Sequence, residues 1–183
     1  MARKSRRQAQ KAPSWVAQKQ KWTGYGVVGL LCAALGSGGT YLALKPALAA
    51  AAASRTTAAE AALTQANSYE DQQQWPLAII AYKQAIAGGL DNPDIRTDLG
   101  VSYFRSQQPK LALEQYQVAQ RQNPNHENSL YNQGSVYAIS GDSARAISLW
   151  QEYLDRFPAG IHAAEAKTLI SELRAHGVSP VAK

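Results

Sequence analysis

Small and aromatic residues recur every 34 positions between residues 66 and 150. Four columns share this interval: small residues at Ala66, Gly100 and Gly134, tyrosines at Tyr69, Tyr103 and Tyr137, alanines at Ala78, Ala112 and Ala146, and aromatic residues at Tyr82, Tyr116 and Trp150. The first two columns are three residues apart and the last two are four apart, and each of these spacings is that of one helix face. Four columns with one period indicate an internal repeat and predict a stack of helix pairs.

Polar and proline-containing stretches at 72–76, 106–109 and 140–143 separate the two helices expected in each unit. The predicted units are residues 59–92, 93–126 and 127–160. After them, residues 161–176 have apolar side chains at Ala166, Leu169, Ile170 and Leu173, the pattern of an amphipathic helix. Such a helix is expected to cap the open end of a repeat stack. Residues 177–183 are expected to form a loose tail.

The middle unit resembles the tetratricopeptide repeat. Its matching residues are Leu99-Gly100-x-x-Tyr103, then Ala112-x-x-x-Tyr116, and Pro124. The third unit is similar but has Gln133 in place of the leucine, and the first departs more, with Gln65 and Ala66 at the Leu-Gly positions. The early tryptophan of the family is replaced by Ala62, Arg96 and Leu130. The resemblance covers residues 59–160 and implies an all-α solenoid of three helix pairs.

The resemblance also implies a concave face lined by the first helix of each pair, here called the first-helix face. Its inward positions would be occupied by Leu63, Asn67, Glu70, Thr97, Val101, Phe104, Arg105, Tyr131, Ser135 and Ile139. An apolar centre of this kind suits an extended or helical protein segment. The alternative is that Phe104 and Tyr131 only pack between repeats. Family members that grip a carboxylate tail need Lys, Arg or Asn at the fifth and ninth positions. Because Leu63, Thr97 and Tyr131 hold the fifth positions, we expect no such clamp.

The N-terminal quarter has a different pattern. Residues 23–44 form an uncharged stretch of 22 residues, about 33 Å long as a helix, which predicts a transmembrane helix. Residues 45–58, which begin with Lys45-Pro46 and continue with alanines, are expected to form a helical stalk. A cleaved signal peptide ending at Ala47-Leu48-Ala49 is the less favoured alternative.

Residues 1–22 form a basic leader with seven cations and no acid: Arg3, Lys4, Arg6, Arg7, Lys11, Lys19 and Lys21. The rest of the chain has 12 basic and 13 acidic residues, so the net charge of +6 comes from the leader alone. The positive-inside rule places this leader on the cytoplasmic or stromal side and the repeat body in the periplasm or lumen. The cations also suit RNA, but a membrane surface explains the adjoining apolar stretch as well.

Composition limits the chemistry of the chain. One cysteine, Cys32, excludes an intrachain disulfide and a cysteine-based zinc site. His126, His162 and His176 are not spaced as metal ligands or as partners of a nucleophile, so no catalytic residue, metal or cofactor is expected.

The sequence therefore predicts a membrane-anchored, non-enzymatic scaffold that binds a protein partner and assists assembly of a membrane complex. Two alternatives stay open: a leader that contacts RNA or the ribosome, and a structural subunit buried in a larger complex. The oligomeric state, including a homo-oligomer, is not determined by these patterns.

Overall fold

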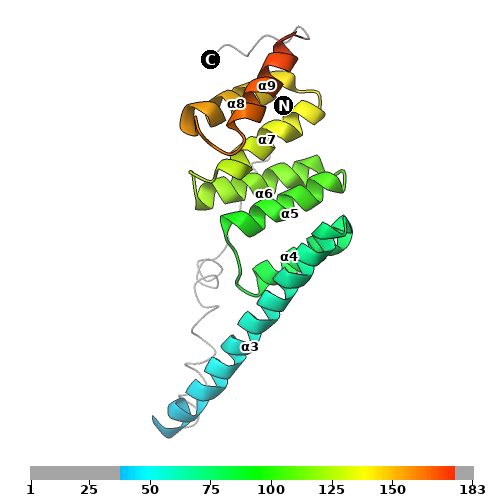
Figure 1. The fold of residues 1–183 in the computed structure, drawn as a ribbon. Helices are drawn as coiled ribbons and strands as arrows, with labels where there is room; N and C mark the ends of the chain where they lie inside the picture. Colours follow the sequence, from blue (N-terminus) through cyan, green and yellow to red (C-terminus); the bar gives the residue numbers. More distant parts are fainter. Residues whose placement is uncertain (1–37, 176–183) are drawn as a thin grey trace, which may run out of the picture. The chain divides into compact units, whose positions relative to one another are not determined.

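The computed structural model describes residues 38–175, with side chains described from residue 45 onward. In this part of the chain the secondary structure is helical throughout. Seven helices follow one another (Figure 1): α3 (Gly38–Asp71), α4 (Trp75–Ala87), α5 (Pro93–Arg105), α6 (Pro109–Gln122), α7 (Glu127–Ile139), α8 (Ser143–Arg156) and α9 (Ala163–Ala175). The chain divides into two units, Met1–Ala51 and Ala52–Lys183, and the helix pairs described below all lie in the second.

The helices of the second unit stack pairwise. Helix α5 packs on α6 and α7 on α8, while α4 contacts α5, α6 contacts α7, and α9 covers α8 (Figure 1). The small column of the repeat makes this close packing feasible. A Cβ atom on Gly100 would lie 2.4 Å from Cε1 of Tyr116, and one on Gly134 would lie 2.5 Å from Nε1 of Trp150. Helices α5 and α7 therefore each lie directly against an aromatic ring of the second helix of their pair.

Helix starts and turns follow from local sequence. The side chain of Asn92 accepts a hydrogen bond from the Ile95 N–H at 2.9 Å, and Pro93 takes the first position of α5. The turns inside the three pairs share one left-handed residue, at Gln73 (φ 57°), Gln107 (φ 61°) and Gly141 (φ 84°). These three positions are again 34 residues apart, so the repeat extends to the backbone conformation of its turns.

The core has two clusters. The first joins α3 to α6 with Val136 of α7, and its largest fully buried side chains are Tyr82 and Tyr116. The second joins α7, α8 and α9 around Trp150 and Tyr153, and Ile170 contributes from α9. The amphipathic segment predicted at 161–176 thus contains a helix, Ala163–Ala175, whose apolar side packs on the last pair.

The predicted fold class needs one correction. Residues 38–44, expected to end a transmembrane helix at Leu44, belong to α3, which continues to Asp71 and contains Pro46 in its interior. Beyond Leu44 this helix consists mainly of alanine and polar residues and includes Lys45, Arg55 and Glu60. No helix in the described range 38–175 combines the length and apolar character that a membrane crossing requires. Residues 23–37 lie outside the described residues.

Candidate functional site

The ten residues predicted for the first-helix face come from α3, α5 and α7, and they differ in exposure. Asn67, Arg105 and Ile139 are exposed, Ile139 with 73% of its surface. Five others are half-buried: Leu63, Glu70, Val101, Phe104 and Ser135. Thr97 and Tyr131 are buried, with 4% and 7% of their surface exposed. Eight of the ten residues are therefore accessible to a partner.

Tyr131 lies inside the second core cluster. Its ring stacks on the ring of His162, with centroids 4.1 Å apart and an interplanar angle of 12°, and it also contacts Trp150 and Tyr153. Its carbonyl oxygen accepts a hydrogen bond from Nε1 of Trp150 at 3.1 Å. Tyr131 thus joins the third repeat to the turn before α9.

Thr97 is held inside α5. Its hydroxyl donates a hydrogen bond to the carbonyl oxygen of Pro93 at 2.8 Å, one turn earlier in the helix. The same hydroxyl lies 3.4 Å from Nδ1 of His126. Its position facing the start of α7 explains why this polar side chain is tolerated in the interior.

Val101 and Phe104 form the apolar centre of the face. Both are half-buried, and both pack against the first core cluster while part of each side chain stays accessible. They are three residues apart on α5 and therefore neighbours on one side of that helix. Arg105 follows at the end of α5 and is exposed. The face thus offers a small apolar patch bounded by a cation on its C-terminal side.

Two polar residues of the face, Asn67 and Glu70, contact the buried Tyr82 of α4. On α3, Glu70 accepts a hydrogen bond from the Tyr82 hydroxyl at 2.5 Å, and the same hydroxyl oxygen lies 3.0 Å from Oδ1 of Asn67. Burial of Tyr82, together with the Glu70 carboxylate, raises the pKa of the phenol above its ordinary value. Glu70 and Asn67 are therefore held in place by the second helix of their own pair.

Asp98 is an acidic residue of this region that the sequence analysis did not select. Burial raises the pKa of its carboxyl from 3.8 to about 6, and the negative charges of Glu70 and Asp94 add to the effect, while His126 opposes it. Asp98 lies between Asp94 and Val101 at spacings of four and three residues, so helical periodicity could have included it. The family pattern of inward positions does not include it.

His126 connects two repeats. Its Nδ1 accepts a hydrogen bond from the backbone N–H of Ser129 at 3.3 Å, which makes His126 the N-cap of α7. Its Nε2 lies 2.9 Å from Oδ1 of Asp94 and is then the donor of that pair. The side chain is 11% exposed, whereas that of Asp94 is 80% exposed. His126 therefore fixes the position of Asp94.

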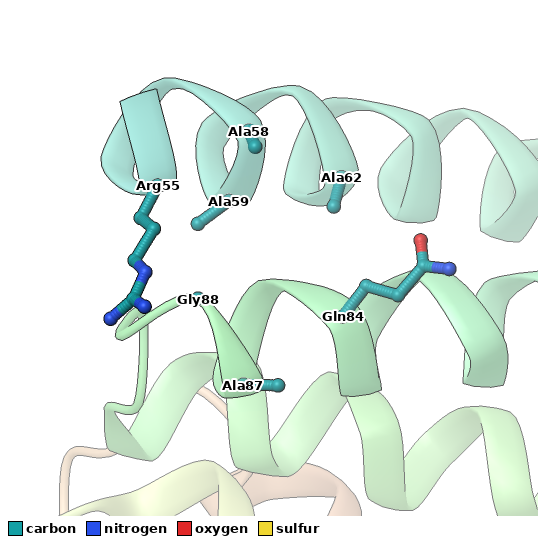
Figure 2. A pocket seen from close by; sticks show the side chains of 7 residues that line it. All are labelled: Arg55, Ala58, Ala59, Ala62, Gln84, Ala87 and Gly88. Atoms are coloured by element: carbon teal, nitrogen blue, oxygen red, sulfur yellow. The ribbon is translucent and has the colours of Figure 1, made fainter. Parts of the chain in front are cut away.

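A second surface lies on the first helix pair. A cavity of about 360 Å³ is lined by α3 and α4 (Figure 2), with Arg55 at one end, Gln84 at the other and small side chains between them. A neighbouring hollow of about 300 Å³ shares Gln84 and is lined by Ile79, Ile80 and Lys83. Ile80 is 53% exposed. The sequence analysis did not identify this surface, because its lining residues lie outside the repeat columns.

The remaining predicted groups are located as follows. The seven leader cations Arg3, Lys4, Arg6, Arg7, Lys11, Lys19 and Lys21, and Cys32, lie outside the described residues. Within residues 38–175, no three His, Cys, Asp or Glu side chains gather closely enough to hold a metal ion.

The repeat pattern, the paired helices and the turns at intervals of 34 residues define a helical repeat protein. The sequence profile of the tetratricopeptide repeat family matches residues 63–127 and 97–161, together more than half of the 183 residues. The chain therefore belongs to the tetratricopeptide repeat family, and the resemblance noted in its sequence is confirmed. A comparison with curated protein sequences finds no match.

Solved structures share the fold at low identity. The TPR2B domain of yeast Sti1, in a complex with pHsp70, has a TM-score of 0.60 at 16% identity, covering 66% of this chain and 99% of that one. The first TPR domain of Spaghetti (RPAP3), bound to the HSP90 peptide SRMEEVD, has a TM-score of 0.59 at 18% identity, covering 68% and 98%. The type III secretion chaperone SycD of Yersinia enterocolitica, in complex with a peptide of the translocator YopD, has a TM-score of 0.60 at 10% identity, covering 65% and 94%. Such identities show a common fold.

Proposed function

We propose that this protein is a non-enzymatic adaptor that binds a segment of a partner protein on its first-helix face. The observation that supports this proposal is the half-buried pair Val101 and Phe104, which leaves an apolar patch accessible at the centre of the face. Repeats of this family form extended surfaces used for protein binding, and three structural neighbours are described with bound peptides or partners. Partner binding by this chain is an extension from those proteins.

A photo-crosslinking experiment tests the proposal. A benzoylphenylalanine replaces Arg105 on the face in one sample, and Gln117, an exposed residue of α6, in a control sample. We expect crosslinked partners from position 105 that disappear when Phe104→Glu is added. Because Phe104 packs against the core, urea denaturation of the variant checks that it folds. Identical crosslinks from the Phe104→Glu variant would show that the partner binds elsewhere.

The surface of α3 and α4 is the second candidate, since the exposed Ile80 lines a hollow on α4 that shares Gln84 with the cavity between the two helices. Ile80→Glu introduces the same charge as Phe104→Glu on an apolar residue of comparable size. If the first-helix face binds the partner, Ile80→Glu leaves the crosslinks from position 105 unchanged. Loss of the partner with Ile80→Glu, but not with Phe104→Glu, would assign binding to α3 and α4.

Location beside a membrane and assistance in assembling a membrane complex are part of this proposal, and they depend on the basic leader 1–22. Seven cations near an anionic surface contribute about 1 kcal/mol each. Cosedimentation of the full chain with anionic vesicles tests the attraction. We expect binding that weakens with salt and is lost when the seven cations are replaced by glutamine. Unchanged binding of that variant would refute a role for the leader.

A further inference from the structure

The cavity of the first helix pair opens at a position that the other two pairs fill with a large side chain. Its lining includes Ala62 of α3, and its volume is about 360 Å³ (Figure 2). In the second pair the equivalent residue, 34 positions later, is Arg96, which donates a hydrogen bond to Oε1 of Gln115 on α6 at 2.9 Å. In the third pair it is Leu130, which is buried with 3% of its surface exposed. The first pair therefore has room for a side chain that Ala62 does not supply.

The exposed side of α4 continues from this cavity and is mainly apolar. Four exposed residues, spaced three, four and three positions apart, form one stripe, here called the α4 seam: Leu77, Ile80, Gln84 and Ala87. Gln84 and Ala87 line both the cavity and the neighbouring hollow of about 300 Å³. In the later pairs, polar or charged residues take two of the apolar positions: Glu114 and Ser148 in place of Ile80, and Arg121 and Asp155 in place of Ala87. The apolar seam is therefore a property of the first pair and not of the repeat.

Two cations border this surface. Arg55 on α3 lines the cavity, and Lys83 on α4 lines the hollow. Among residues 45–175 neither cation forms an ion pair, and no residue lining the cavity or the hollow is acidic. A second copy of this chain would bring the same cations to the contact. Charge complementarity therefore favours an acidic partner over self-association.

We propose that the α4 seam and the adjoining cavity bind an amphipathic helix of a partner protein, which inserts one large apolar side chain beside Ala62 and places carboxylates near Arg55 and Lys83. A stripe with alternating three- and four-residue spacing accepts a second helix along its length, and a groove beside it accepts the anchor side chains of that helix. This inference goes beyond the proposed function, because it concerns a different surface and does not require the first-helix face to bind a partner.

Three labelled peptides test the proposal with the full-length protein by fluorescence anisotropy. The peptide GELLEEWLELLEEG is an acidic amphipathic sequence, GKLLKKWLKLLKKG has lysine in place of each glutamate, and GELLEEALELLEEG has alanine in place of the tryptophan. We expect the first peptide to bind at least about tenfold more tightly than either of the others. Equal binding of the tryptophan and alanine peptides, or preference for the lysine peptide, would overturn the proposal.

Two substitutions locate the binding, since the basic leader 1–22 also attracts acidic peptides. Ala62→Leu introduces the residue that the third pair has at the equivalent position and fills part of the cavity. Ile80→Glu places a charge in the seam, and because Ile80 is 53% exposed this variant keeps the test decisive if the first one is destabilised. We expect each to weaken the acidic tryptophan peptide at least about tenfold, with urea denaturation showing that the variant folds. Unchanged binding in both folded variants would refute the site.

A matched pair of lysine substitutions tests the charge contribution. Lys83→Gln introduces the residue that α6 and α8 have at the equivalent position, and Lys167→Gln removes the same charge from an exposed position on α9. We expect Lys83→Gln to weaken the acidic tryptophan peptide about threefold and Lys167→Gln to leave it unchanged. Equal effects would show unspecific charge attraction and refute the assigned cation.

Other occupants of the seam give different results. If a second copy covers it, the full chain sediments as a dimer without peptide and Ile80→Glu makes it monomeric. If an anionic membrane covers it, Ile80→Glu weakens cosedimentation with anionic vesicles. Either result would overturn the acidic helix as the occupant. The proposed function fails separately: unchanged crosslinks from position 105 in the Phe104→Glu variant refute binding at the first-helix face, whatever binds at the α4 seam.

Discussion

Replacing Asp98 by asparagine is expected to stabilise the folded protein at neutral pH. The carboxyl lies on α5 and is half-buried. Burial is the largest cause of its raised pKa, followed by repulsion from Glu70 on α3 and Asp94 on α5, whereas His126 lowers it. Asparagine has nearly the same shape and carries no charge, so the substitution removes these unfavourable contributions without creating a cavity.

The magnitude follows from the difference between the folded and unfolded states. The pKa is about 6 in the folded state against an ordinary value of 3.8. Between about pH 4 and pH 6 the folded protein keeps a proton that the unfolded chain loses, so the free energy of unfolding falls as the pH rises. At about 1.36 kcal/mol per pKa unit, the penalty above pH 6 is about 3 kcal/mol. Solvent that reaches the half-buried carboxyl reduces the expected value to about 1–2 kcal/mol.

Urea denaturation followed by circular dichroism measures this effect. At pH 7.5 we expect Asp98→Asn to raise the free energy of unfolding by about 1–2 kcal/mol. At pH 4.5 the gain should fall to less than about half of that value, because the wild-type carboxyl is then largely protonated in the folded state. Glu114→Gln, at an exposed position on α6, is the control and should change stability little at either pH. A gain that is equal at both pH values, or a loss at pH 7.5, would refute the electrostatic reasoning.

Three further predictions concern the repeat itself, each measured as the urea midpoint of the full chain. Gly100→Ala should destabilise the fold by about 1–3 kcal/mol, because the added Cβ would lie 2.4 Å from Cε1 of the buried Tyr116 ring; an unchanged midpoint would mean that the ring can move. Gln107→Gly should stabilise the fold by about 0.5–1 kcal/mol, because this exposed residue has a φ of 61°, which glycine adopts without steric cost. A lower urea midpoint would show that the left-handed backbone at this residue is not strained. Asn92→Ala should lower the free energy of unfolding by about 1 kcal/mol, because the hydrogen bond from the Ile95 N–H is lost. Asn92→Ser should keep most of this stability, because serine can also cap the helix. Equal destabilisation by the two variants would contradict the capping role.

Much of the repeat could be predicted because its signals are local. The columns containing Gly100 and Tyr116 specify which face of each helix packs against the other helix of its pair. The number of times the 34-residue period recurs gives the number of helix pairs. The burial of Tyr116 and the close approach of Gly100 agree with that expectation. The family profile matches residues 63–127 and 97–161, two overlapping stretches that are offset by the same 34 residues.

Prediction of which residues are accessible on the first-helix face was less complete, for a physical reason. The position of a residue within a repeat indicates a helix face, but its exposure depends on what the next element places over it. Tyr131 is covered because the chain before α9 brings His162 onto its ring. Thr97, at the same repeat position on α5, is buried as well, whereas Phe104 at another inward position of that helix is half-buried. The inward positions of the family pattern were thus insufficient to separate interior residues from accessible ones.

The uncharged stretch at 23–44 shows the limit of reasoning from one segment alone. Length and lack of charge were sufficient to predict a helix that ends at Leu44, but α3, described as Gly38–Asp71, continues well beyond this residue. Alanine and other good helix formers after Pro46 favour continuation. Packing of its last turns against α4, through Ala66 and the Tyr82 hydroxyl, then stabilises the C-terminal part.

By itself the sequence determined the helical repeat, its period, its capping segment and its family, because short-range spacing and turn residues encode these properties. The tertiary structure decided which of these side chains are accessible and how their charges interact. Asp98 is ordinary in sequence, and its raised pKa arises where burial on α5 coincides with Glu70 from the preceding repeat. Such a coincidence depends on distances between helices that no single segment encodes.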